Sequence, residues 1–388
     1  MMADNRIHSI DSLRALAMLS GVLLHALTLY LEPIDGSGLR LWAGALMTWI
    51  TTWRMPLFMI ISGFLVVAAL RKRSTASFFS NRLFRVGSPL ILLWIFIPKV
   101  NENASPMFSA PDIFVWIENG SVSSVHLGHL WFLLYLLLFC IITLIIRNSV
   151  SDRILALMNF KIYRPTWLLF WIPVLTLLSI FSKTGALFLE VPLVLSNLFS
   201  DLNWASFGYL FVFFVIGMQL YQNQNLLQQL QKIPFIFLTL LPFSLTPLVI
   251  LTLGAEKPEA FIFTDRLELL SAHLFASVST LLLCLGIIGL AQKLLDAHNR
   301  FISFFTKLSY PIYFFHHVFI YSIGGMLVLA GWNSLLAVIV NCLIAIAFSI
   351  LLYYVFVKFT PLDWIFNGYK RSWLKLKKEP FNRYLKEL

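Results

Sequence analysis

The chain has 388 residues, of which 59% are hydrophobic and 12% are charged, and its mean hydropathy is +0.82. These values exclude an ordinary soluble domain, in which roughly 45–50% of residues are apolar and about 25% are charged. The formal net charge is +11, but the basic residues lie between apolar runs and near the C-terminus. They indicate membrane topology rather than a nucleic-acid partner, and the sequence predicts a multi-pass membrane protein.

Apolar runs, most of them of about 18 residues or more, indicate ten transmembrane helices. In chain order they lie near 11–31, 43–69, 86–100, 129–146, 166–182, 205–221, 233–253, 271–292, 303–330 and 335–358. We expect an all-α fold in a single membrane domain over 1–388, because the connectors are too short for a separate soluble core. The first run is too long for the apolar region of a signal peptide and lacks a cleavage site, so we expect it to remain.

The connectors alternate in charge. Basic residues follow the second, fourth and eighth spans, namely Arg71, Lys72, Arg73, Arg82 and Arg85, then Arg147, Arg153, Lys161 and Arg164, then Lys293, Arg300 and Lys307. The opposite connectors carry acidic residues such as Glu32, Asp35, Glu118, Glu190 and Glu256. By the positive-inside rule, both termini are expected in the cytoplasm, with 359–388 as a basic cytoplasmic tail.

The first span places Asp11, Arg14 and His25 in an apolar segment. Ionisable groups inside a membrane helix are costly, so they are candidates for function. Helical spacing puts them on one face together with Met18 and Gly21, and His25 lies about 16 Å further along the helix than Arg14. A histidine can act as a general base for a hydroxyl because its ordinary pKa is near neutrality. Taken alone, Arg14 could equally well only reach the inner interface, and His25 could only bond to a neighbouring helix, but their shared face favours function.

Short motifs lie in other spans. They are Arg14-x10-His25, Trp53-Arg54-Met55-Pro56, Ser62-Gly63-Phe64, Arg82-x-x-Arg85, His129-Leu-Trp131 and Tyr313-Phe-Phe-His316-His317. In this order and placement they resemble the integral-membrane acyltransferase 3 family, from the first span to the tenth. The residues within these motifs are most similar to those of its glucan biosynthesis protein C branch, whose members succinylate glucans in the bacterial periplasm.

The resemblance implies an enzyme of the bacterial inner membrane that transfers an acyl group, other than an aminoacyl group, from cytoplasmic acyl-CoA to hydroxyls of a periplasmic glucan. Succinyl-CoA is the first choice of donor substrate, and acetyl-CoA is the second. The same residues also fit the acetylation of a different envelope glycan such as O-antigen, or a protein that transports a glycan or lipid. Direct transfer and an acyl-enzyme route both stay open, as does a homo-oligomeric state.

The resemblance also implies a donor site. Arg82 and Arg85 would bind the CoA phosphates, although topology alone explains a basic cluster at this place. Gly21 would leave room for the pantetheine arm, or would let two helices pack closely. By analogy, Arg14 would hold part of the CoA or brace the first helix, with Asp11 as its partner.

The remaining implied contacts concern the acyl group and the acceptor. Arg54 would bind the free carboxylate of a succinyl group or orient a hydroxyl, or it would only anchor the helix at the interface. His129 would contact the acceptor or lie at the headgroup level as an ordinary interfacial residue. Tyr310 belongs to the same polar stretch as His316 and His317, which point about 100 degrees apart on a helix, so we expect one of the two histidines to face the catalytic cavity.

Metal and redox chemistry lack support in the sequence. The histidines His25, His129, His316 and His317 show no metal-ligand spacing, and no bound cofactor is expected. Cys140, Cys284 and Cys342 lie in apolar runs, where free thiols are expected rather than disulfides.

Overall fold

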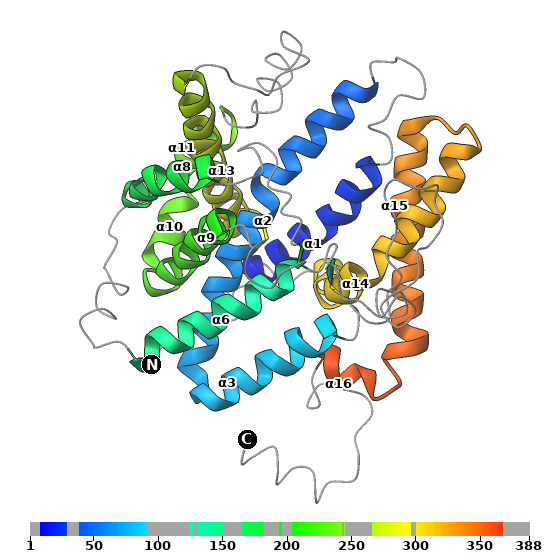
Figure 1. The fold of residues 1–388 in the computed structure, drawn as a ribbon, viewed down its shortest axis with the longest axis horizontal. Helices are drawn as coiled ribbons and strands as arrows, with labels where there is room; N and C mark the ends of the chain where they lie inside the picture. The colour runs from blue at the N-terminus through cyan, green and yellow to red at the C-terminus, as the bar shows by residue number, and fades with distance from the viewer. Residues whose placement is uncertain are drawn as a thin grey trace, which may run out of the picture. The chain divides into compact units, whose positions relative to one another are not determined.

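The computed structural model describes residues 8–28, 39–91, 125–126, 131–149, 165–181, 194–195, 204–242, 244, 266–295 and 300–367. Within these ranges the chain is almost entirely helical (Figure 1). The strands are a two-residue antiparallel pair, β1 (Val125–His126) and β2 (Val194–Leu195). The predicted all-α fold is confirmed for the described residues.

Most of the predicted spans coincide with helices. These are α1 (His8–Thr28), α2 (Leu39–Lys72), α6 (Trp131–Ser149), α8 (Trp171–Phe181), α9 (Trp204–Gln222), α13 (Arg266–Leu294), α14 (Arg300–Leu329) and α15 (Ser334–Leu352). A 3₁₀ turn, η3 (Pro165–Phe170), leads into α8, and α11 (Ile233–Leu240) begins the seventh predicted span. Most of the third predicted span and the end of the seventh lie outside the described residues.

Five helices of the described chain are long and apolar enough to cross a membrane: His8–Thr28, Ala45–Lys72, Ala205–Gln222, Leu270–Leu294 and Leu335–Val357. Two shorter apolar helices, Trp131–Arg147 and Trp167–Phe181, coincide with predicted spans as well. This agrees with a multi-pass membrane protein. The number of ten spans and the cytoplasmic location of both termini stay predictions.

Three short helices lie outside the predicted spans: α3 (Thr75–Arg82), α10 (Asn225–Leu230) and α16 (Leu362–Asn367). The Ser74 side chain caps α3 by accepting a hydrogen bond from the Ser77 N–H. α10 buries three leucines, and α16 falls in the segment predicted as a tail but buries Asp363 and Phe366. Helices of this length need tertiary packing to be stable, which apolar periodicity alone does not reveal.

The chain forms two compact units that interleave along the sequence. Unit 1 comprises Met1–Leu65, Ala156–Val191 and Asn203–Ser309, and unit 2 comprises Val66–Leu155, Pro192–Leu202 and Tyr310–Leu388. The prediction of one membrane domain stays a prediction.

In unit 1, α13 packs against α1, α8, α10 and α11, as Figure 1 also indicates for the last three. The helices α2 and α9 approach each other closely. A Cβ atom added at Gly63 would overlap the carbonyl oxygen of Phe214, and one added at Gly217 would overlap that of Ile60. Glycine at both positions therefore allows the two backbones to touch, as small residues commonly do between membrane helices.

Unit 2 contains two π-helical segments, η1 (Leu83–Gly87) and η5 (Tyr353–Val357), and both contact α16. α6 packs against α3 and η1. Near the C-terminal end of α6, the side chain of Arg147 donates a hydrogen bond to the carbonyl of Leu70 at 3.4 Å. α14 and α15 are joined by the buried amide of Asn341, which donates to the carbonyl of Ile320 at 3.0 Å.

Candidate active site

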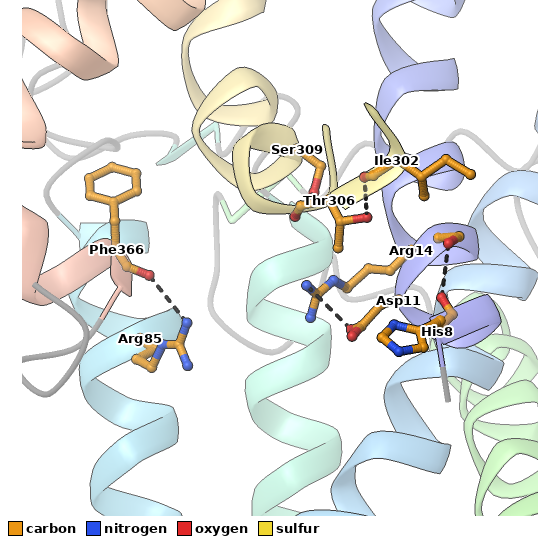
Figure 2. Close-up of polar contacts among 9 residues, drawn as sticks. His8, Asp11, Arg14, Arg85, Ile302, Thr306, Ser309 and Phe366 are labelled. Carbon is orange, nitrogen blue, oxygen red and sulfur yellow. Dashed lines mark hydrogen bonds and ion pairs between the residues drawn. The ribbon is translucent and has the colours of Figure 1, made fainter. Parts of the chain in front are cut away.

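The first polar feature of α1 is an ion pair between Asp11 and Arg14 (Figure 2). The Arg14 Nη2 and Asp11 Oδ1 atoms are 3.7 Å apart, and 35% of the Arg14 side chain is exposed. At this distance and exposure the pair orients the two side chains more than it stabilises the fold. The predicted partnership of Asp11 with Arg14 is therefore present, since residues three apart are neighbours on a helix.

The second polar feature of α1 is the place where Arg54 of α2 meets Gly21. A Cβ atom added at Gly21 would lie 2.6 Å from Arg54 Nη1 and 3.7 Å from Arg54 Cζ. The guanidinium therefore occupies the space that a side chain at position 21 would need. Gly21 is buried, and His25 lies one turn further along the same face, about 6 Å away in rise.

Arg54 lies well inside α2, which begins at Leu39. The preceding Trp53 is 3% exposed, and its backbone carbonyl accepts a weak hydrogen bond from the Cys284 thiol at 3.6 Å. The arginine is half-buried, as is His25. The structure thus brings together three predicted site residues of unit 1: Gly21, His25 and Arg54. The proposed place for a pantetheine arm beside Gly21 stays a prediction.

The two arginines of the predicted donor site have different contacts in unit 2. The guanidinium carbon of Arg82 lies 5.2 Å from the centroid of the Phe78 ring, and its Nε atom is buried with no hydrogen-bond partner among the described residues. Arg85 Nη2 donates instead to the carbonyl oxygen of Phe366 at 3.3 Å (Figure 2). Both side chains are half-buried.

Tyr310 lies beside Arg85. Its hydroxyl donates a hydrogen bond of 2.6 Å to the backbone carbonyl of Arg85, and its ring packs edge-on against Phe314. The structure therefore gives Tyr310 a contact in the predicted donor region, and its predicted role in binding substrate stays a prediction.

The neighbouring histidines of α14 point in different directions, as their helical spacing predicts. His316 is fully buried, and its Nδ1 lies 2.7 Å from the carbonyl of Tyr313, which assigns the Nδ1–H tautomer. The His317 ring stands at 90° to that of His316 and 4.7 Å from the Tyr321 ring. Which of the two faces the catalytic cavity stays a prediction, and His129 lies outside the described residues.

One polar pair was not predicted from the sequence. Ser179 Oγ of α8 and His273 Nδ1 of α13 are 3.0 Å apart, and both residues are buried. The Ser179 hydroxyl also donates to the carbonyl of Thr176 at 2.9 Å, so it accepts the hydrogen bond from His273. The signal for His273 was the same as for His25, an ionisable residue inside an apolar run. Cys140, Cys284 and Cys342 are free thiols, as predicted.

A family model described as an acyltransferase domain matches residues 7–354 of this chain. The chain therefore belongs to the acyltransferase 3 family, as its motifs predicted, and it is a membrane acyltransferase. It is similar to the glucans biosynthesis protein C of Escherichia coli strain K12 and to that of E. coli O9:H4 strain HS. Each is 22% identical to it over 386 residues, which cover 94% of this chain and 94% of the relative. No solved structure matches the chain.

Proposed function

We propose that this enzyme transfers a succinyl group from cytoplasmic acyl-CoA to hydroxyls of a periplasmic glucan. The observation that carries the proposal is the Arg54 guanidinium, which lies against Gly21 one turn from His25. A succinyl group ends in a free carboxylate, and arginine binds carboxylates through two parallel N–H donors. A cation inside an apolar helix is costly, which supports a functional role for it. The relatives named for glucan biosynthesis support the acceptor.

His25 is the general base of the proposed reaction. Its imidazole takes the proton of the acceptor hydroxyl while the hydroxyl oxygen attacks the carbonyl carbon of the thioester. The new carbon–oxygen bond forms the ester, the carbon–sulfur bond breaks, and CoA leaves as a thiolate that takes up a proton. Arg54, one turn away, holds the distal carboxylate of the same acyl group. This direct route needs one transfer step, whereas an acyl-histidine intermediate needs two.

Arg82 and Arg85 are the proposed contacts of the CoA phosphates. They lie in and beside η1, between the second and third predicted spans, a region that the charge pattern assigns to the cytoplasm. Acyl-CoA is a cytoplasmic metabolite and the glucan is outside, so the acyl group has to pass from this side to His25. Asp11 and Arg14, which form an ion pair, lie at the beginning of the face that leads there, the end that the charge pattern predicts to be cytoplasmic.

The experiment is acyl transfer by the purified protein in reconstituted vesicles. Succinyl-CoA or acetyl-CoA is supplied on one side and glucan on the other, and mass spectrometry measures the ester formed. We expect succinylation, its loss in His25→Ala, and a selective loss of succinyl over acetyl transfer in Arg54→Gln. Full succinylation by His25→Ala would refute the role of His25 as general base. Glycan transport without acyl-CoA would instead support a transporter.

A further inference from the structure

The C-terminal helix α16 (Leu362–Asn367) contacts both π-helical segments of unit 2. In η1 the N–H of Ser88 bonds to the carbonyl of Leu83, and in η5 the N–H of Lys358 bonds to the carbonyl of Tyr353 at 2.8 Å. Single π-helical turns are rare and occur frequently at functional sites. Because η1 contains Arg85, the contact between α16 and η1 is a candidate functional site.

Arg85 is held from two directions. Its side chain donates to the carbonyl oxygen of Phe366, in the last turn of α16, at 3.3 Å (Figure 2). Its backbone carbonyl accepts from the hydroxyl of Tyr310 at 2.6 Å. The last carbonyls of a helix have no partner within that helix, so Phe366 offers a natural acceptor. A guanidinium carries five N–H donors in a planar fork, and a bond from one of them sets the direction of the whole group.

Side-chain contacts at both ends of α16 hold it against the rest of unit 2. The ring of Phe366, which is 6% exposed, packs edge-on against Phe314 with centroids 5.1 Å apart and lies 6.0 Å from the ring of Tyr310. At the other end, Asp363 is 2% exposed and accepts a hydrogen bond from the Tyr353 hydroxyl at 3.3 Å. A helix this short would not hold its position without such contacts. Together they fix the carbonyl that Arg85 contacts.

We propose that Phe366 and Tyr310 are positioning residues that aim the Arg85 guanidinium at the phosphates of acyl-CoA. The inference rests on the proposed function, in which Arg85 binds the donor. η1, the end of the tenth span and the beginning of the ninth are all predicted on the cytoplasmic side. In unit 2, α16 contacts η1 and η5, and Tyr310 contacts Arg85. That is the arrangement a site for a cytoplasmic ligand requires. The segment predicted as a tail thus includes a helix that completes the donor site.

The test measures kcat and the KM for succinyl-CoA with the full-length protein in vesicles. We expect Arg85→Ala to raise this KM about tenfold, by loss of a charge-assisted contact. Phe366→Ala should raise it about threefold and leave kcat within about twofold, because its effect passes through Arg85. Phe366→Leu, which keeps apolar volume, should restore most of the affinity. Ser309→Ala is the matched control, because Ser309 is next to Tyr310 in sequence but its hydroxyl donates within α14 to the carbonyl of Thr306. It should change neither constant.

The double variant decides whether Phe366 acts through Arg85. If it does, adding Phe366→Ala to Arg85→Ala raises the KM no further, whereas independent effects would add and would refute the positioning role. Tyr310→Phe removes one hydroxyl and keeps the ring, so it tests the same idea if Phe366→Ala fails to fold, and an unchanged KM would count against it. An unchanged KM in Arg85→Ala would overturn the donor site itself. If Arg85→Ala raises the KM but the Phe366 and Tyr310 variants do not, the donor site stands and only the positioning role is refuted.

Discussion

Replacing Gly21 by alanine tests whether the contact between α1 and Arg54 serves catalysis. The added Cβ would lie 2.6 Å from Arg54 Nη1, whereas an unstrained contact needs roughly 3.5 Å. The guanidinium therefore has to move by about 0.9 Å. It is the end of a flexible side chain, so the fold can yield, and alanine gains roughly 0.5–1 kcal/mol over glycine in helix propensity. We expect the free energy of unfolding to change by less than about 1 kcal/mol.

The activity should respond far more strongly. A misplacement of about 1 Å in a substrate-holding group can lower the rate about 100-fold, so we expect succinyl transfer by Gly21→Ala to fall between about 10- and 100-fold. Initial rates in vesicles with succinyl-CoA and acetyl-CoA, together with thermal unfolding in detergent, measure both quantities. Acetyl transfer should fall less, because acetyl has no distal carboxylate. The matched control is Gly208→Ala in α9, where the new Cβ would meet the side chain of Leu178 at 3.2 Å. Unchanged succinyl transfer by a folded Gly21→Ala would refute the reasoning.

Three further outcomes are expected. His25→Ala should lower kcat about 10²- to 10⁴-fold, the usual contribution of a general base, without weakening equilibrium binding of acyl-CoA; a near-normal kcat would exclude that role. Gly63→Ala should destabilise the protein in detergent by about 1–3 kcal/mol, because its Cβ would lie 2.9 Å from the Phe214 carbonyl carbon and neither backbone can yield locally. A melting temperature equal to that of the parent would contradict this packing. Ser179→Ala should cost about 1 kcal/mol through its lost contact with His273 and leave kcat unchanged; a large loss of kcat would instead indicate a catalytic pair.

The positions of the long helices followed from the sequence, because in lipid a helix satisfies its backbone hydrogen bonds within its own segment. Apolar runs therefore predicted α1, α2, α9 and α13 to within a few residues at most ends. The pairing of Asp11 with Arg14 was predictable for the same reason, since one turn of helix determines which side chains are neighbours. Family membership was predictable too, because the motifs occur at recognisable places within those helices.

The partners of these helices were decided by the tertiary structure. The bond between Arg85 and Phe366 joins residues 281 positions apart, and that between Ser179 and His273 spans 94. Helical periodicity contains no information on which distant helix supplies a partner, so the contact of Gly21 with Arg54 was also not determined by it. The two arginines of one motif looked equivalent in sequence, but one lies over Phe78 and the other bonds to α16. The sequence by itself determined which residues lie in the long helices and which of their faces are polar, because those depend on local bonds and spacing. Only packing between segments far apart in the chain decided what each polar group contacts.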